Sequence, residues 1–300
     1  MGDSCLAYYG YRFEMDRTHL DHRLTDEERE SFEAKGFFVV PGALDTDTVE
    51  TLLEATDELE RIQRPIYEAK GLKPHQQLNV LDFMGKDERF LPLIDWPKTF
   101  MKVVDILGWH IQLYHSHIIV TPPLPQSNWD KRRRLGWHQD SGRINIDIES
   151  NPRPRISLKV GFFITDTTEI GRGNFHVVPG SHLQNTLRLP DDPHENPSNA
   201  VPVCTRPGDA VFFDRRLWHA AGRNTSSHTR KALFYGYSYR WLKPRDDMTV
   251  SHYMTDADPV RKQLLGASPN GGFGFTSPTD EDVPLKTWIE ENLGKDAVIP

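Results

Sequence analysis

Short strand-like runs, separated by glycine and proline, fill the chain from His110 to Arg240 and constrain its fold more than any other feature. The runs are rich in β-branched and aromatic residues, which are typical of strands. They cover residues 111–120, 135–140, 155–165, 175–178, 210–213, 217–221 and 230–240. About seven or eight short strands with this punctuation predict a mainly β protein with flanking helices and a double-stranded β-helix, or jelly-roll, as its core.

The N-terminal part of the chain carries helix signals instead. Thr25 with Glu28 three positions later forms a capping box, and Gly36 ends the helix that the box opens. Asp47 offers a second cap, and apolar residues at helical spacing follow it. Residues 96–107 are a further helix candidate. We expect these helices to buttress one sheet of the jelly-roll.

The length of the chain favours one domain. A chain of 300 residues can bury a full core, and β-rich domains of about 200 to 250 residues routinely fold as one unit. We predict a single domain, 1–300, with the following parts: an N-terminal extension (1–24), a mostly helical buttress (25–108), a jelly-roll core (109–240) and a C-terminal tail (241–300). The loop 184–200 is rich in Pro, Asp and Asn and is expected to form a lid.

Charge and cysteine content exclude several classes of protein. The 36 basic and 43 acidic residues give a formal charge of -7, which argues against general affinity for nucleic acid or anionic membranes. Only Cys5 and Cys204 occur, so no disulfide framework is indicated. Neither a signal peptide nor an apolar run of about eighteen residues is visible. The sequence predicts a cytoplasmic protein and gives no indication of its oligomeric state.

His138 and Asp140 are the strongest candidates for a metal site. They lie two positions apart in an expected strand, so both side chains point to the same face. His219 lies in a later strand that can approach the first pair. Two imidazoles and one carboxylate, with other positions open, suit non-haem Fe(II) and oxygen. An isolated His-X-Asp pair is more often a polar strand face, so this interpretation needs support from the rest of the chain.

Arg230 provides that support. If the turn after His219 closes a hairpin, residues whose numbers sum to about 450 face each other, which places Arg230 opposite His219. A guanidinium there matches a carboxylate in two-point fashion, as a dicarboxylate co-substrate that chelates the metal would need. The alternative is a solvated hairpin residue.

Three sequence blocks resemble the phytanoyl-CoA dioxygenase family of Fe(II)- and 2-oxoglutarate-dependent oxygenases. They are Trp-His-Gln-Asp at 137–140, Gly-Asn-Phe-His-Val-Val-Pro-Gly-Ser-His at 173–182, and Gly-Asp-Ala-Val-Phe-Phe at 208–213, which continues to Arg230. The likeness extends from about Thr25 to Tyr239 and implies a cupin-like core with Fe(II), 2-oxoglutarate and O2 as cofactor and co-substrates.

The resemblance also implies roles for individual residues. His138, Asp140 and His219 become the iron ligands, and Arg230 the partner of the distal carboxylate of 2-oxoglutarate.

Two further positions carry over from the family. His117 resembles a residue that lines the co-substrate pocket, and Phe162 resembles a position where an aromatic ring often packs on that pocket. One departure is visible: two residues after His219 the family often has a hydroxyl, whereas this chain has Ala221. The corresponding hydrogen bond to 2-oxoglutarate must be missing or supplied elsewhere.

The activity implied by the resemblance is oxidation of an unactivated C–H bond in a small organic substrate, with release of succinate and CO2. Halogenating relatives lack a carboxylate at the position of Asp140, so its presence favours hydroxylation, desaturation or rearrangement over chlorination. Two alternatives stay open. A cupin-type metal-dependent isomerase or hydrolase would not explain Arg230, and a non-catalytic binding protein would be expected to have lost a ligand or the arginine.

The substrate is not identified by the sequence. The basic cluster Lys131–Arg134 is either a solvated flap or a clamp for an anionic substrate. Arg143, Arg153 and Arg155 are either solvated or available to hold a substrate carboxylate. Natural-product acids, lipids or acyl thioesters, amino-acid derivatives and phosphonates all remain open.

Overall fold

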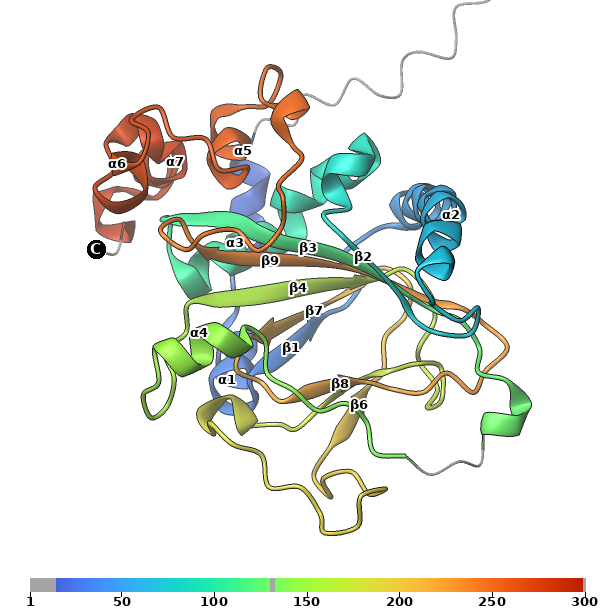
Figure 1. The fold of residues 1–300 in the computed structure, drawn as a ribbon. Coiled ribbons are helices and arrows are strands. Elements are labelled where there is room, and N and C mark those ends of the chain that lie inside the picture. The colour runs from blue at the N-terminus through green and yellow to red at the C-terminus, as the bar shows by residue number, and fades with distance from the viewer. Residues whose placement is uncertain (1–14, 130–132, 299–300) are drawn as a thin grey trace, which may run out of the picture.

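Two antiparallel sheets face each other in the computed structural model, which describes residues 15–129 and 133–298 (Figure 1). The larger sheet has the order β1 (Phe37–Val40), β7 (Asp209–Asp214), β4 (Ser157–Phe163), β9 (Arg230–Tyr239), β3 (Ile111–Thr121), β2 (Leu78–Leu81). The smaller sheet has the order β6 (Val201–Val203), β5 (Phe175–Val177), β8 (His219–Ala221). The predicted mainly β jelly-roll with flanking helices is confirmed, although the described strands form two facing sheets and no closed barrel.

The central strands of the larger sheet, β7, β4, β9 and β3, are buried on both faces, whereas alternate residues of the edge strand β2 are exposed. Along β4, Leu158, Val160 and Phe162 belong to the core beneath the helices. Phe163 belongs to a second core, which fills the space between the two sheets. Because successive side chains of a strand alternate between faces, Lys159 shares the inner face with Phe163. The alternation of side chains along each strand therefore determines which residues point into the space between the sheets.

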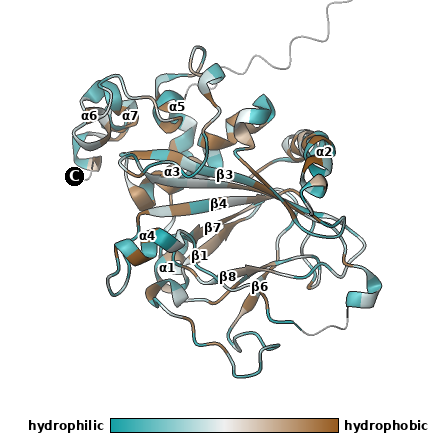
Figure 2. Cartoon of the chain, in the orientation of Figure 1, coloured by the Kyte–Doolittle hydropathy of each residue, from teal (hydrophilic) through white to brown (hydrophobic). Residues whose placement is uncertain are grey.

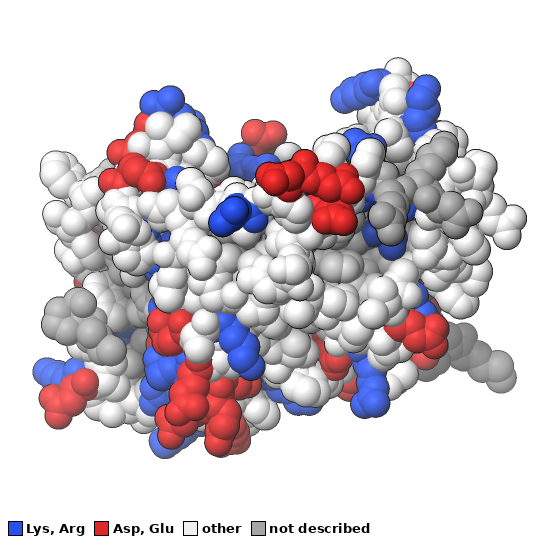
Figure 3. All heavy atoms as spheres, turned by 90° about the horizontal axis from the view of Figure 1, so that it is seen from below, with Lys and Arg blue, Asp and Glu red and all other residues white. Residues whose placement is uncertain are grey.

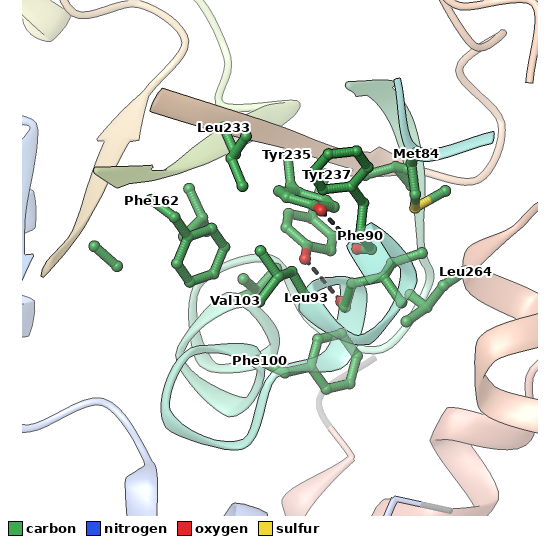
Figure 4. Packing of buried hydrophobic residues seen from close by; sticks show 14 of the residues in the cluster. Met84, Phe90, Leu93, Phe100, Val103, Phe162, Leu233, Tyr235, Tyr237 and Leu264 are labelled. Carbon is green, nitrogen blue, oxygen red and sulfur yellow. Dashed lines mark hydrogen bonds between the residues drawn. The ribbon is translucent and has the colours of Figure 1, made fainter. Parts of the chain in front are cut away.

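Helices cover the outer face of the larger sheet (Figure 1). The main ones are α2 (Thr46–Ala69), the 3-10 helix η3 (Glu88–Asp95) and α3 (Pro97–Leu107). Two tyrosines of β9 point into this core and anchor η3, as Figure 4 shows. Tyr235 donates to the carbonyl of Phe90 at 2.6 Å, and Tyr237 donates to that of Ile94 at 2.7 Å. Both hydroxyls thereby satisfy their hydrogen bonds while the rings add apolar contact.

The first helix begins as predicted. The helix α1 (Asp26–Lys35) is capped by Thr25 and Glu28, which form the reciprocal capping box, and it ends at Gly36 with φ 83°. The predicted cap of α2 is wrong by two residues. The side chain of Asp45, and not that of Asp47, accepts the Thr48 N–H at 2.8 Å.

The C-terminal residues are more than a polar tail. They form α5 (Pro259–Leu264), α6 (Phe273–Thr276) and α7 (Pro284–Leu293). Leu264, Leu285 and Ile289 belong to the same core as the helices of the outer face. Arg261 pairs with buried Asp95 at 2.7 Å and ties this segment to η3.

The remaining helices are short. They are η1 (Arg17–His22), η2 (Met84–Lys86), η4 (Gln126–Asn128), α4 (Gly142–Asp147), η5 (Ser181–Leu183), η6 (Ser251–Tyr253), η7 (Asp280–Asp282) and η8 (Lys295–Ala297). Of the predicted extension, η1 packs beside α3, whereas residues 1–14 lie outside the described part of the chain.

Apolar residues concentrate in the strands, and polar residues dominate the connecting segments (Figure 2). Lysines and arginines are interspersed with acidic residues on the face that Figure 3 shows. Within residues 15–129 and 133–298, no helix is both long and apolar enough to cross a bilayer.

Replacement of Phe162 tests this packing. The ring is fully buried under the helices, so Phe162→Ala should lower the free energy of unfolding by about 3–5 kcal/mol. Denaturant unfolding measures the change. Phe273 is 77% exposed and gives a matched control, for which we expect a change within about 0.5 kcal/mol. A similar, small effect for both variants would contradict the burial of Phe162 in the core beneath the helices.

Candidate metal centre and co-substrate site

A backbone bridge between two segments creates the candidate metal centre. The predicted strand 135–140 is an extended segment in which only His138 makes a β-bridge, with His219 of β8. Each of the two residues donates its N–H to the carbonyl of the other at 3.0 Å. The imidazole rings consequently lie side by side, with centroids 4.3 Å apart.

Asp140 completes the group. Its N–H donates to the carbonyl of Arg215 at 2.9 Å, and its carbonyl accepts from the Asn145 side chain at 3.0 Å, so its backbone is held at both ends. One potential ligand atom from each of His138, Asp140 and His219 lies within 4.8 Å of the others. In the described part of the chain, this is the one cluster of three or more His, Cys, Asp or Glu side chains with such spacing.

Hydrogen bonds determine which ring nitrogen each imidazole can offer to a metal ion. The Nδ1 of His138 lies 2.9 Å from the carbonyl of Gly136, and the Nδ1 of His219 lies 2.8 Å from that of Leu217. A carbonyl can only accept, so Nδ1 carries the proton and the lone pair of Nε2 is free. This is the usual arrangement of histidines that bind a metal. The donor set therefore fits one divalent cation.

The electrostatics of the group also suit a cation. Burial lowers the pKa of His219 to about 4, so its ring is neutral at neutral pH. Burial opposes the charge of Asp140, but Lys159 and the imidazoles outweigh it and hold the carboxyl pKa below its usual range. The ammonium of Lys159 lies 3.0 Å from Oδ1 and 2.9 Å from Oδ2 of Asp140. Sequence reasoning missed Lys159, because a lysine within a strand gives no local signal of its partner.

Arg230 is a buried cation without a counter-charge. It is 2% exposed, and its guanidinium carbon lies 5.2 Å from the ring of Phe163 and 5.9 Å from that of Phe234. Its Nε and Nη1 have no hydrogen-bond partner, and no carboxylate pairs with it, among the described residues. Burial lowers its pKa to about 10, so it stays charged at neutral pH. Because an unpaired buried charge is costly, this arrangement fits an anionic ligand.

The predicted hairpin between His219 and Arg230 is wrong. The strand β8 pairs with β5, whereas β9 pairs with β3 and β4 of the other sheet. The connection crosses between the sheets, where Asn224 donates to the carbonyl of Thr121 at 2.8 Å. The two residues nevertheless face the same inner core. Two rings link them: the centroid of Phe213 lies 5.2 Å from that of His219 and 6.3 Å from that of Phe234, and the Arg230 guanidinium lies over the ring of Phe234.

The structure places His117 on this inner face. Its ring stacks on Phe234 with centroids 4.8 Å apart and on His115 with centroids 4.5 Å apart. Its Nδ1 is buried without a partner in the described chain, and burial holds its pKa well below the usual value. His117 is thus available to a ligand that also contacts Arg230.

Phe162 requires a correction. It lies on the outer face of β4, where its ring meets Tyr235 at 5.8 Å, and so it does not reach the site. Its neighbour Phe163 occupies the inner face and lies against Arg230. A shift of one residue along a strand exchanges the faces, which explains the error. Ala221, at the end of β8, provides no side-chain hydrogen bond.

The loop 184–200 is fastened to the segment that carries His138. Arg134 donates to the carbonyls of Pro190, Asp192 and Glu195. The side-chain oxygen of Asn196 accepts from the Trp137 indole at 2.9 Å. Arg134 therefore anchors this loop, whereas Lys131 and Arg132 of the basic cluster lie outside the described residues.

The three arginines considered as partners of a substrate carboxylate each have a carboxylate partner within the protein. Their pairs are Arg143 with Asp147, Arg153 with Glu149, and Arg155 with Glu33 and Asp214. None of them is a free cation like Arg230.

Comparison with known proteins gives related sequences. The family model described as phytanoyl-CoA dioxygenase matches residues 32–232. Proteins of Mycobacterium tuberculosis and Mycobacterium bovis, both described as uncharacterised, are each 30% identical over 249 residues, which cover 80% of this chain and 86% of their own. The peroxisomal phytanoyl-CoA dioxygenase of Mus musculus is 24% identical over 240 residues, which cover 70% of this chain and 67% of its own.

A solved structure shares the fold. HygX of Streptomyces hygroscopicus, crystallised with nickel, 2-oxoglutarate and hygromycin B bound, is similar with a TM-score of 0.54 and 19% identity. The similarity covers 74% of this chain and 90% of HygX.

The buried imidazole of His219 predicts a pH dependence of stability. Its pKa is about 4 in the folded chain and 6.5 in an exposed imidazole, so the unfolded chain binds more protons between these values. The free energy of unfolding of the metal-free protein should therefore fall as the pH drops from 6.5 to 4, and His219→Gln should remove part of this fall. Urea unfolding at several pH values measures it, and an equal fall in both proteins would contradict the explanation.

Proposed function

Because the chain belongs to the phytanoyl-CoA dioxygenase family, we propose that it oxidises an unactivated C–H bond of a small organic substrate and converts 2-oxoglutarate to succinate and CO2. It is an oxidoreductase, and its cofactor and co-substrates are Fe(II), 2-oxoglutarate and O2. The observation that supports the proposal most strongly is the combination of the His-Asp-His cluster with an unpaired buried arginine on the same inner core.

We assign the iron to His138, Asp140 and His219. The two Nε2 atoms and one carboxylate oxygen provide three donors, which matches the two-histidine, one-carboxylate set of non-haem iron oxygenases. When bound, Fe(II) would supply the activation of oxygen for the decarboxylation and for the attack on the substrate. The backbone bridge and the Nδ1 hydrogen bonds fix the ligands before the metal arrives, so little reorganisation is needed.

We assign the distal carboxylate of 2-oxoglutarate to Arg230. Its two unpartnered nitrogens offer donors to a carboxylate, and such charge-assisted pairs are the strongest hydrogen bonds in proteins. Phe163 and Phe234 flank the guanidinium and exclude water from it. The unpartnered Nδ1 of His117 is a further candidate contact to the co-substrate, and it offers one substitute for the hydroxyl that Ala221 lacks.

Two other functions fit less well. A cupin-type isomerase or hydrolase would use the metal cluster but would leave the buried charge of Arg230 unexplained. A binding protein on the same scaffold would not need both the three proposed iron ligands and Arg230. The carboxylate of Asp140 favours hydroxylation, desaturation or rearrangement over halogenation.

The substrate is proposed only as a class. HygX binds the small molecule hygromycin B in its crystal structure, and we propose that a small molecule also binds here. We also propose that this small molecule carries an anionic group. Arg133, an exposed member of the basic cluster, is available to such a group, whereas the arginines at positions 143, 153 and 155 are paired.

Turnover of 2-oxoglutarate tests the proposed function. Protein incubated with Fe(II), 2-oxoglutarate and O2 should form succinate, and Asp140→Gly should abolish this because the iron loses a ligand. Succinate can be quantified by mass spectrometry. An undiminished rate in Asp140→Gly would contradict the ligand assignment, and the absence of both turnover and 2-oxoglutarate binding in the wild type would contradict the function.

Replacement of Arg230 tests the co-substrate assignment. Arg230→Gln should weaken 2-oxoglutarate binding by about 10- to 100-fold, as expected for loss of a charged hydrogen-bond partner worth roughly 1.5–3 kcal/mol. Calorimetry on the Mn(II)-loaded protein measures it. Arg240, near the other end of β9, is also buried but donates to the carbonyls of Gln263 and Ala267. Arg240→Gln is the matched control, and equal losses in the two variants would contradict a direct role for Arg230.

A further inference from the structure

Lys159 is a buried cation that the proposed function leaves without a role. It lies on the inner face of β4 and is 4% exposed. Its ammonium lies 6.0 Å from the ring centre of Phe213 and contacts both carboxylate oxygens of Asp140. Among the described residues, Asp140 is the only acidic partner of this lysine. The only charge that compensates Lys159 therefore belongs to a proposed iron ligand.

Lys159 and Arg230 differ in position and in pairing. Lys159 and Phe163, the ring beside Arg230, are four positions apart along β4, which corresponds to about 13 Å of strand. Within residues 15–129 and 133–298, Arg230 has no counter-ion and is free to bind the co-substrate, whereas Lys159 already holds a carboxylate. The two cations therefore serve different partners.

The contact between the Lys159 ammonium and the Asp140 carboxylate has two consequences for the binding of a metal ion. An ammonium beside both oxygens of Asp140 competes with a divalent cation for the same negative charge. The carboxylate also has two oxygens, so Lys159 can keep a hydrogen bond to one of them while the other serves as ligand. A carboxylate held in this way offers a single donor and cannot occupy a second coordination position.

We propose that Lys159 is a positioning residue that restricts Asp140 to one metal–oxygen bond and so keeps a coordination position open for 2-oxoglutarate. This inference rests on the proposed function, because it requires Asp140 to be a ligand. It predicts opposite effects on two affinities. Loss of the ammonium removes a competitor of the metal, but it also frees the second oxygen of Asp140 to take the position that 2-oxoglutarate needs.

Lys159→Met provides the test, with Mn(II) as the metal probe. We expect Mn(II) to bind this variant about tenfold more tightly and 2-oxoglutarate to bind the Mn(II)-loaded variant about tenfold more weakly, as for gain or loss of one interaction of roughly 1.4 kcal/mol. Electron paramagnetic resonance of free Mn(II) and calorimetry with 2-oxoglutarate measure the two affinities. Lys159→Arg keeps the charge and the donors, so it should restore both affinities toward the wild type.

Lys231→Met is the matched control. Lys231 also lies in the larger sheet and is buried, but it pairs with Asp57 of α2 away from the site. It should change neither affinity. Unchanged affinities in a folded Lys159→Met protein, or a loss of both, would overturn the inference, since a purely structural lysine predicts losses in the same direction. Wild-type protein that binds neither Mn(II) nor 2-oxoglutarate would instead overturn the proposed function.

Discussion

The central strands of the larger sheet, β7, β4 and β9, are buried on both faces, and the site depends on this constraint. Because side chains alternate along each strand, every second residue of β4 and β9 points between the sheets and the others point to the helices. Lys159, Phe163 and Arg230 share the inner face, whereas Tyr235 and Tyr237 anchor η3 on the outer face. The packing of the helices on the outer face holds these strands in their register. It thereby keeps the charged side chains of Lys159 and Arg230 on the inner face.

The inner core is organised by charge as well as by shape. A buried cation needs a counter-charge, and the two here meet that need differently. Lys159 is balanced by Asp140, whereas no carboxylate of the described part of the chain pairs with Arg230. The ring of Phe213 contacts Lys159, the neutral imidazole of His219 and Phe234, and Phe234 in turn contacts Arg230. The distal carboxylate of the co-substrate would supply the counter-charge that Arg230 lacks among the described residues.

Local signals in the sequence predicted much of this architecture. The capping box of Thr25 and Glu28 and most of the strand runs appear where the patterns place them. The wrong predictions have a common cause. They concern features that are determined by residues far apart in the sequence. The sequence did not reveal that β8 and β9 belong to different sheets, because the segment between them looks like a hairpin turn and their pairing partners, β5 for β8 and β3 and β4 for β9, lie elsewhere in the chain.

A similar limit applies to the site. A pattern of aromatic residues does not say which of Phe162 and Phe163 faces inward, and Lys159 meets Asp140 across two segments nineteen positions apart. The most direct test is a crystal structure of the protein loaded anaerobically with Fe(II) and 2-oxoglutarate, with anomalous data at the iron edge. We predict one iron bound by His138, Asp140 and His219, with a 2-oxoglutarate carboxylate on Arg230. Iron at another position, or a 2-oxoglutarate that does not contact Arg230, would contradict it.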